Sequence, residues 1–504
     1  MMKQILLILA SITFATACEG ATDIKAPDAI TLSADELVFT LADAAASLPL
    51  TITAPAAPNI GIPAYAKDWL TVTDGAYADY KKTVMFNVTA NPDAKERTAT
   101  VNITAPGVSA TTVKITQYGK TSSAGHTDSF SSGVKDPMDL GLGWNLGNQL
   151  DAINGGVSNE TCWGNPAATQ ATFDAVRAAG FHTVRIPVTW MGHIGQAPDY
   201  SIEEGWMNRV YQVVEYAEKA GLNVILNTHH DENHGDNHWL DLKGAVEDAS
   251  KNAQLKEEIA AVWKQIALRF KEKGDFLVLE SFNELIYGDQ WSIGSNASKK
   301  AGIINEWNQV FVDAVRATGG NNATRWIGVP GYAANPNYLK YVTVPSDPAG
   351  KTMLAFHCYD PYDYTIGDKQ LANWGHSGTA YRNGENEINN LFSSLRDNYV
   401  AKGIPLYMGE YGCSFRSKAD PKAWAYFLYY LEYVTKAAKT YGFPAILWDN
   451  GSAGSGKERH GYFNHGTGEY FPTSQEAVET ISRAWNTTDA AYTLQSVYDS
   501  APTF

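Results

Sequence analysis

The sequence predicts two domains: a (β/α)8 TIM barrel, preceded by a small all-β sandwich of the immunoglobulin-like class. After residue 135, eight short apolar runs with strand character recur, and amphipathic stretches with helical spacing lie between them. Residues 29–119 instead alternate polar and apolar positions and carry little helical periodicity. Residues 120–134 are rich in Ser, Gly and Thr, so we expect a linker there. With 504 residues, 44% of them hydrophobic, the chain can build a core in each domain.

The start of the chain has the pattern of a secretory signal. A positively charged beginning is followed by an apolar run at residues 5–10, and small residues lead directly into Cys18. This arrangement resembles the lipobox of bacterial lipoproteins, although Ala15 stands where Leu is usual. The resemblance implies a lipoprotein signal peptide at residues 1–17, lipidation of Cys18 and a tether at residues 18–28.

Plain secretion, with cleavage just before Cys18, is the alternative. Because the apolar run is too short to span a bilayer, the membrane would be a partner only through the lipid. We expect a protein on the cell surface or in the periplasm, anchored to the outer membrane, or else secreted.

Residues 29–119 are expected to form the sandwich. The segments 98–104 and 111–118 alternate in the way of half-buried strands. The segments 68–72 and 114–117 resemble the BACON domain, an immunoglobulin-like module of many Bacteroidetes carbohydrate-active proteins. Its name implies carbohydrate binding, but a spacer remains equally open, because few aromatic platforms are present: Tyr65, Trp69, Tyr77 and Tyr80, of which Trp69 is expected in the core.

Residues 135–504 are expected to form the barrel. The predicted strands are 140–148, 182–188, 223–230, 276–284, 325–332, 353–360, 405–411 and 445–450. Helical patterns lie between them, for example at 171–179, which Gly180 ends, and at 255–273. A doubly wound open sheet is the alternative, but no glycine-rich phosphate fingerprint follows the first strand.

Polar and aromatic residues gather where the predicted strands end, which in such a barrel is the face that carries the active site. A lone His or Arg at such a place commonly has a purely structural role. Repetition on seven of the eight strands favours a functional site. These residues are Asn145, Asn148, Arg185, His229, His230, Asn283, Glu284, His357, Tyr359, Glu410, Tyr411, Trp448, Asp449 and Asn450.

Two of these residues, Glu284 and Glu410, end the fourth and seventh strands. Hydrolysis of a glycosidic bond requires one carboxyl group that protonates the leaving oxygen and another that attacks or stabilises the anomeric carbon. A positioned pair of glutamates satisfies this requirement. Because strands four and seven lie on opposing parts of the barrel rim, we expect the two long side chains to converge across the pocket.

Six motifs resemble those of glycoside hydrolase family 5, and their order and spacing cover residues 138–487. They are LGWNLGN at 142–148, VRIPV at 184–188, NTHH at 227–230, FNE at 282–284, HCY at 357–359 and GEYG at 409–412. The resemblance implies a barrel, a retaining mechanism, no metal and no other cofactor. The opening motif, Asp151-Ala152 and the paired histidines are most similar to bacterial endo-β-1,4-glucanases and xyloglucanases.

The same resemblance implies the catalytic roles. Glu284 matches the acid/base and Glu410 the nucleophile. Arg185 would keep Glu410 ionised, and Tyr359 would donate a hydrogen bond to it. No cation is expected beside Glu284, which would keep its proton for the leaving group. Leu285 departs from the Pro that many members carry after the acid/base, with little effect on the role of Glu284.

The remaining predicted residues would bind substrate. His357 would lie near the acid/base, Asn283 would bind the 2-hydroxyl of the cleaved sugar, and Trp448 would be the floor on which a ring stacks. His229 and His230 line the site, and which of them contacts sugar stays open. Asn148 and Asn450 complete the predicted set.

Several partners and cofactors are unfavourable. The formal net charge of −15 opposes binding to nucleic acid. The mature chain would keep Cys162, Cys358 and Cys413, an odd number that excludes a disulfide framework. His230 and His234 have a zinc-like i, i+4 spacing, but Gly235 and its neighbours predict a loop, so no metal is expected.

The expected partner is a β-glucan of the plant cell wall, such as xyloglucan, mixed-linkage glucan or a cellulose derivative, and the chain is expected to act as a monomer. Two aromatic segments, 287–291 and 373–375, would wall a wide cleft, unless their Trp residues only pack loops. A β-mannanase or xylanase on the same barrel is the enzymatic alternative. A non-catalytic surface glycan-binding lipoprotein is the alternative of another class, and it would typically lack one of the two carboxylates.

Overall fold

The computed structural model describes residues 25–34, 36–39, 46–91, 97–117, 132–232 and 238–504. The chain divides into two compact units, Met1–Thr127 and Asp128–Phe504. The division falls inside the predicted linker at 120–134. The predicted signal peptide, Cys18 and most of that linker lie outside the described residues. Within the described residues, every helix is too short or too polar to cross a membrane.

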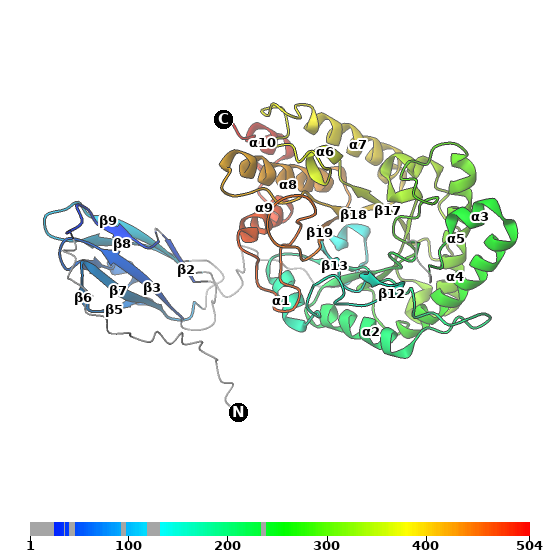
Figure 1. Ribbon diagram of the computed structural model, residues 1–504, viewed down its shortest axis with the longest axis horizontal. Helices are drawn as coiled ribbons and strands as arrows, with labels where there is room; N and C mark the ends of the chain where they lie inside the picture. Colours follow the sequence, from blue (N-terminus) through cyan, green and yellow to red (C-terminus); the bar gives the residue numbers. More distant parts are fainter. Residues whose placement is uncertain (1–24, 35, 40–45, 92–96, 118–131, 233–237) are drawn as a thin grey trace. The chain divides into compact units, whose positions relative to one another are not determined.

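The first unit is a sandwich of two sheets (Figure 1). One sheet runs β1-β3-β7-β5, with β6 also paired to β7, and the other runs β2-β9-β8-β4. The strands are β1 (Thr31–Leu32), β2 (Glu36–Phe39), β3 (Ala46–Thr53), β4 (Asn59–Gly61), β5 (Leu70–Thr73), β6 (Tyr77–Ala78), β7 (Lys81–Val88), β8 (Arg97–Thr104) and β9 (Thr111–Gln117).

Period-2 patterning builds the core of this unit. On β8, Ala99, Val101 and Ile103 are buried and the residues between them are exposed, which is the pattern of a strand with one face inside. Trp69 is buried in the same core, as expected, and the guanidinium of Arg97 lies 4.7 Å from its ring centroid. The predicted all-β sandwich is thus confirmed.

The second unit is a closed parallel barrel of β10-β13-β14-β15-β16-β17-β18-β19, which confirms the predicted (β/α)8 fold. Its strands are β10 (Leu142–Leu146), β13 (Thr183–Ile186), β14 (Asn223–Leu226), β15 (Leu277–Glu280), β16 (Ile327–Pro330), β17 (Thr352–Cys358), β18 (Leu406–Tyr411) and β19 (Ala445–Asp449). A hairpin of β11 (Ile153–Asn154) and β12 (Val157–Ser158) follows the first strand. Most barrel strands end before their predicted ends, so many site residues stand in the connections that follow.

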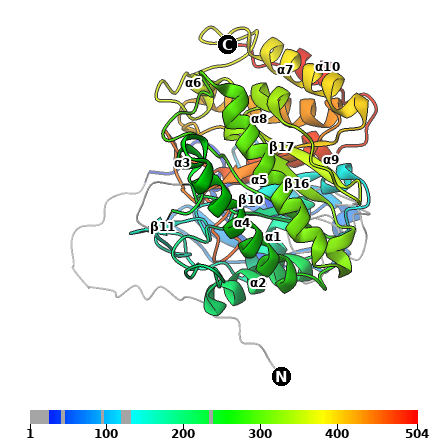
Figure 2. The same ribbon diagram turned by 90° about the vertical axis from the view of Figure 1, so that its right-hand side faces the viewer.

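Helices surround the barrel, and Figure 2 shows α4 and α5 side by side on its outside. The long helices are α1 (Gln170–Ala178), α2 (Glu204–Lys219), α4 (Ala249–Arg269), α5 (Ala297–Ala317), α7 (Gly384–Asn398), α8 (Pro421–Tyr441) and α9 (Ser474–Asn486). The short ones are α3 (Leu242–Glu247), α6 (Tyr362–Thr365) and α10 (Leu494–Asp499). Short 3-10 helices occur at Ala64–Ala66, Pro137–Leu140, Gly320–Ala323, Tyr332–Ala334, Pro336–Tyr341 and Val400–Lys402.

The helix predicted at 255–273 begins earlier, at Ala249. The reason is a cap: the carboxylate of Asp248 accepts a hydrogen bond from the backbone N–H of Ser250, and this satisfies one of the free donors of the first turn.

Candidate active site

Alternation along the barrel strands places the site residues directly above an apolar layer. Val278, Ala355 and Ile446 belong to one buried cluster, which is separate from the cluster that packs the strands against the helices. Side chains two residues apart on a strand share a face. The residues two positions later on these strands therefore point into the same interior: Glu280, His357 and Trp448.

Glu410 faces the interior because β18 contains a bulge. Phe356 is in register with Met408, whereas the next residue, His357, is in register with Glu410, so β18 has one extra residue between them. Tyr407 belongs to the interior cluster, and strict alternation from it would turn Glu410 outward. The bulge restores the inward direction and sets Glu410 beside His357.

The two predicted catalytic carboxylates converge. The Glu284 side chain is 20% exposed and that of Glu410 is 7% exposed. A carboxylate oxygen of each and a ring nitrogen of His357 all lie within 4.8 Å of one another. Retaining glycosidases hold their carboxyl groups about 5 to 5.5 Å apart, whereas inverting ones leave about 6.5 to 9.5 Å for a water. The spacing fits the retaining arrangement.

Arg185 and Tyr359 contact Glu410 as predicted. Nη1 of Arg185 donates to Oε1 of Glu410 at 2.8 Å, and the Tyr359 hydroxyl donates to Oε2 at 2.9 Å. Both contacts stabilise the ionised form of Glu410. Burial nevertheless raises the pKa of Glu410, Glu284 adds to the rise by like-charge repulsion, and His357 and Arg185 oppose it without cancelling it. Arg185 is thus one of several influences on the charge of Glu410.

His357 stands between the two carboxylates. Its Nδ1 lies 2.6 Å from Oε1 of Glu284 and 3.7 Å from Oε2 of Glu410. Burial lowers the pKa of His357, but the charges of Glu410 and Glu284 outweigh burial, and the net pKa is raised. The expectation that no cation lies beside Glu284 is therefore wrong, because an imidazole that favours its protonated form occupies that place.

Aromatic rings form a row that runs from Trp448 to Trp163. Trp448 and His229 are stacked, with ring centroids 6.0 Å apart and an interplanar angle of 5°. His230 contacts His229 edge-on at 4.4 Å, and its side chain is 26% exposed. Trp163 continues this row, with its ring 5.8 Å from that of His230 and 43% of the residue exposed. The row provides flat apolar faces of the kind on which sugar rings stack.

Burial controls the protonation of the paired histidines, His229 and His230. Burial lowers the pKa of His230 to about 4, and it lowers that of His229 well below its ordinary value. Both rings are therefore neutral at pH 7. Nε2 of His230 lies 3.7 Å from Oδ2 of Asp151, whose pKa burial raises to about 7.

The predicted asparagines occupy different places. Oδ1 of Asn283 accepts a hydrogen bond from Nη2 of Arg185 at 2.8 Å, so Asn283 belongs to the catalytic cluster. Asn148 has a left-handed φ of 53° in the turn that Asp151 holds. The Asn450 amide accepts from the backbone N–H groups of Ser452 and His460 and donates to a carbonyl, so its side chain holds the loop after β19.

The two aromatic segments that were predicted to wall the cleft, 287–291 and 373–375, differ in the exposure of their Trp residues. Trp291, in 287–291, is 61% exposed. Trp374, in 373–375, is fully buried and packs against Tyr429, Tyr430 and Tyr364. Trp374 thus packs a loop and does not wall a cleft.

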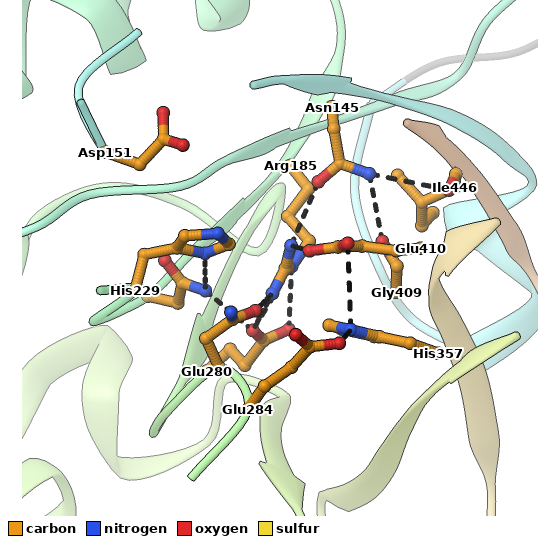
Figure 3. A network of polar contacts seen from close by, with 12 residues as sticks. Asn145, Asp151, Arg185, His229, Glu280, Glu284, His357, Gly409, Glu410 and Ile446 are labelled. Carbon is orange, nitrogen blue, oxygen red and sulfur yellow. Dashed lines mark hydrogen bonds and ion pairs between the residues drawn. The ribbon is translucent and has the colours of Figure 1, made fainter. Parts of the chain in front are cut away.

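Three interior residues that contact the site were not predicted: Asn227, Glu280 and Tyr407. Asn145, which the sequence placed at the end of the first strand, contacts the site as expected. Asn145 accepts from Nη1 of Arg185 and donates to the carbonyl of Gly409. Glu280 pairs with Arg185 at 2.7 Å (Figure 3). The available signal for Glu280 was a single charge at the end of an otherwise apolar strand.

Two groups of side chains carry metal-ligand chemistry: Asp151 with His229 and His230, and Glu284 with His357 and Glu410. In the second group the guanidinium of Arg185 already supplies a cation at 2.8 Å from Glu410. His234, the second histidine of the zinc-like i, i+4 spacing, lies outside the described residues.

Comparisons with known proteins agree with this site. The family model described as cellulase (glycosyl hydrolase family 5) matches residues 150–454, which is more than half of the chain and includes both carboxylates. The chain belongs to glycoside hydrolase family 5. A second model, BACON, described as a putative N-terminal binding domain, matches residues 60–118 and confirms the resemblance in the sandwich.

Individual relatives of this family 5 chain match it over about two thirds of its length or more. Endoglucanase A of Paenibacillus barcinonensis is 37% identical over 343 residues, covering 64% of this chain and 83% of that protein. The solved broad specificity endoglucanase from Bacteroides salanitronis is 47% identical, with a TM-score of 0.68, covering 72% of this chain and 99% of that one. The Bacteroides ovatus xyloglucanase, solved with a XXXG heptasaccharide, is 28% identical with a TM-score of 0.61, and covers 91% and 100%.

Proposed function

We propose that this family 5 glycoside hydrolase is a retaining, endo-acting β-glucanase that cleaves β-1,4 bonds of plant cell-wall glucans. The observation that carries the proposal is the pair Glu284 and Glu410, close enough for a retaining mechanism, with Arg185 and Tyr359 bonded to Glu410. The presence of both carboxylates argues against a binding-only lipoprotein. Relatives named endoglucanase and xyloglucanase support the choice of substrate.

In the first step, Glu410 attacks the anomeric carbon while Glu284 protonates the departing glycosidic oxygen. A covalent glycosyl-Glu410 ester forms and the sugar beyond the cleaved bond leaves with the proton. The Arg185 and Tyr359 hydrogen bonds hold the attacking carboxylate in one orientation.

In the second step, Glu284, now ionised, removes a proton from a water that attacks the same carbon, and Glu410 is released. Two inversions give net retention. His357, at 2.6 Å from Glu284, is placed to compensate the charge that Glu284 gains and loses in each cycle.

Azide rescue separates the two roles. With Glu284→Ala, an aryl glycoside with a good leaving group needs no acid, so the intermediate forms and azide releases it as the β-glycosyl azide. With Glu410→Ala, azide attacks directly and gives the α-azide. Wild-type enzyme is the control, and its rate is expected not to rise with azide. Proton NMR of the wild-type product is expected to show retention, and an inverted product would overturn the assignment.

Xyloglucan is proposed to be among the best substrates. Support comes from the xyloglucanase among the similar structures and from the exposed rings of Trp163 and Trp291, which suit an open cleft. Reducing-sugar release is to be measured on xyloglucan, mixed-linkage β-glucan, carboxymethylcellulose, glucomannan and xylan, with viscosity loss as the sign of endo action. Activity on mannan or xylan alone would instead favour the enzymatic alternative.

We also propose a monomer that leaves the cytoplasm and is anchored through a lipid on Cys18. The supporting observation is the lipobox-like sequence up to Cys18. Labelled fatty acid is expected to appear in the wild type and to be absent from Cys18→Ala, while the activity of the barrel persists in the soluble fraction. Labelling that is equal in the two proteins would contradict the anchor.

A further inference from the structure

The guanidinium of Arg185 lies between two carboxylates, and only one of them has a role in the mechanism. Its Nη1 donates to Glu410 at 2.8 Å, and its Nη2 donates to Oε1 of Glu280 at 2.7 Å. Nε adds two longer contacts to Glu280 at 3.2 Å. Figure 3 shows the guanidinium between Glu410 and Glu280, in contact with both. Glu280 therefore makes the larger number of contacts that orient Arg185.

Glu280 is buried and its oxygens are occupied. The Tyr407 hydroxyl donates to Oε2 at 2.6 Å, and Nδ2 of Asn227 donates to Oε1 at 2.9 Å. Burial alone would raise the pKa of Glu280, but the charge and hydrogen bonds of Arg185, with the bond from Tyr407, outweigh it and lower the pKa. Glu280 is thus a permanent carboxylate at neutral pH, and Arg185 is a cation shared by two anions.

Asn227 extends this network to the aromatic row. Its Oδ1 accepts the backbone N–H of Val188 at 3.2 Å, so Nδ2 must face Glu280 and also Nδ1 of His229, 3.2 Å away. An amide NH2 only donates, so Nδ1 of His229 accepts. The neutral ring then carries its proton on Nε2, the nitrogen not bonded to Asn227.

We propose that Glu280 is the positioning residue of the active site: one buried carboxylate that holds Arg185 against the nucleophile Glu410 and, together with the backbone N–H of Val188, orients Asn227, whose NH2 group sets the tautomer of His229. The part that concerns the nucleophile rests on the proposed function. The part that concerns His229 does not, because the tautomer is a property of the enzyme without substrate.

Charged and titratable groups reach this network from five strands or the connections after them. They are Arg185 on β13, His229 after β14, Glu280 on β15 with Glu284 after it, His357 on β17 with Tyr359 after it, and Tyr407 and Glu410 on β18. Among them Glu280 contacts Arg185 and Tyr407 directly and reaches His229 through Asn227. Without the charge of Glu280, Arg185 would pair with Glu410 alone. The pKa of Glu410 would then fall, because the cation stabilises its ionised form.

The test compares Glu280→Gln and Glu280→Asp with the wild type on an activated aryl β-cellobioside. Because this leaving group needs no acid, the acid limb of kcat/KM reports the ionisation of Glu410. Glu280→Gln is expected to move that limb to lower pH and to reduce the glycosylation rate about 10- to 100-fold, since Arg185 loses its anchor. Glu280→Asp keeps the charge, so the limb is expected to stay while the rate falls.

Glu385→Gln is the matched control. Glu385 is also buried and accepts hydrogen bonds from His376 and Tyr429, but it belongs to α7. This variant is expected to lose thermal stability and to keep the wild-type acid limb and rate. The same behaviour in Glu280→Gln, a loss of stability alone, would overturn the proposal.

Nitrogen-15 NMR of His229 tests the second half without any turnover. The wild type is expected to show a protonated Nε2 and an unprotonated Nδ1. Asn227→Asp replaces the donor with an acceptor, so the proton is expected to move to Nδ1. A proton on Nδ1 in the wild type would refute the Asn227 link, whatever the activity.

If Glu280→Gln does not fold, Tyr407→Phe removes a single hydrogen bond from Oε2 of Glu280 and carries the kinetic test. A smaller loss of rate is then expected, with an unchanged His229 signal. If the wild-type protein showed no hydrolytic activity, the proposed function would be rejected. The result on the His229 tautomer would not be affected.

Discussion

The indole of Trp448 lies so close to the chain that only glycine fits beneath it. A β-carbon at Gly147 would come within 2.7 Å of Cη2 of Trp448 and 2.7 Å of the carbonyl oxygen of Asp449. Trp448 is in turn stacked on His229. Gly147, in the opening motif, therefore sets the height of the ring that is expected to bind sugar.

Gly147→Ala is expected to displace Trp448 and to lower kcat/KM on glucan about 10-fold or more, mainly through KM, because a misplaced ring contacts the sugar poorly. Steady-state kinetics and tryptophan fluorescence measure the two effects. Gly302→Ala, in α5 with no atom within 4 Å of the added carbon, is the matched control and should change neither. Unaltered kinetics in Gly147→Ala would disprove this dependence.

At the scale of strands, β16 and β18 are coupled across the barrel interior. A β-carbon at Gly328 on β16 would collide with the Tyr407 hydroxyl oxygen, which is the atom that donates to Glu280. The glycine thus leaves the space through which Tyr407 reaches the buried carboxylate.

Gly328→Ala is expected to destabilise the barrel by about 1–3 kcal/mol, the usual effect of overpacking, and to slow glycosylation by moving Tyr407. Denaturant unfolding measures the change in the free energy of unfolding, and kinetics on an aryl cellobioside measure the glycosylation rate. Gly61→Ala, on a strand of the sandwich with 3.6 Å to its nearest neighbour, offers a comparison that should spare the barrel. An equal stability of Gly328→Ala and wild type would mean that the interior tolerates the extra carbon.

At the scale of the whole molecule, the two units have separate hydrophobic cores. One contains sandwich residues only, such as Phe86 and Val101, and the other contains barrel and helix residues, such as Trp144 and Trp307. Every predicted site residue except Cys18 lies after residue 132. Each unit thus meets the basic requirement for folding independently.

A chain shortened to begin near residue 131 is therefore expected to fold and to keep the kcat of the full chain on soluble glucan. Circular dichroism checks the fold and initial rates check the turnover. A large loss of turnover in a truncated barrel that remains folded would show that the sandwich contributes to the site. Loss of binding to insoluble substrate alone would instead favour the carbohydrate-binding interpretation of the sandwich over the spacer.

Buried acids make the stability of the barrel depend on pH. Burial raises the pKa of Asp151 and of Asp231 from 3.8 to about 7. Between these values the folded chain holds protons that the unfolded chain has released, so the free energy of unfolding falls as pH rises from about 4 to about 7. Asp151→Asn, which cannot titrate, should flatten this slope in denaturant unfolding at several pH values. A slope that is unchanged in the variant would show that Asp151 is ionised in the folded state.

The amino-acid sequence was enough to predict the architecture and to single out Glu284 and Glu410 as the candidate catalytic pair. Parallel barrel strands are buried on both faces, so they appear as short apolar runs, and helices appear between them with a 3.6-residue period. Glu284 and Glu410 were identifiable because each stands in a motif that resembles those of the family, FNE at 282–284 and GEYG at 409–412, whereas Glu280 does not. The sandwich was predictable because period-2 alternation is a local property.

Several contacts between the charged side chains depend on the three-dimensional fold and could not be predicted from local patterns. The bulge in β18 turns Glu410 inward, and its register depends on the pairing with β17, which no local pattern records. The shared guanidinium between Glu280 and Glu410 likewise joins strands far apart in the chain, and the sequence did not predict the contact with Glu280. Local patterns report which face a side chain takes, whereas its partners are set by packing across the barrel. The electrostatics of the site therefore followed from the fold as a whole.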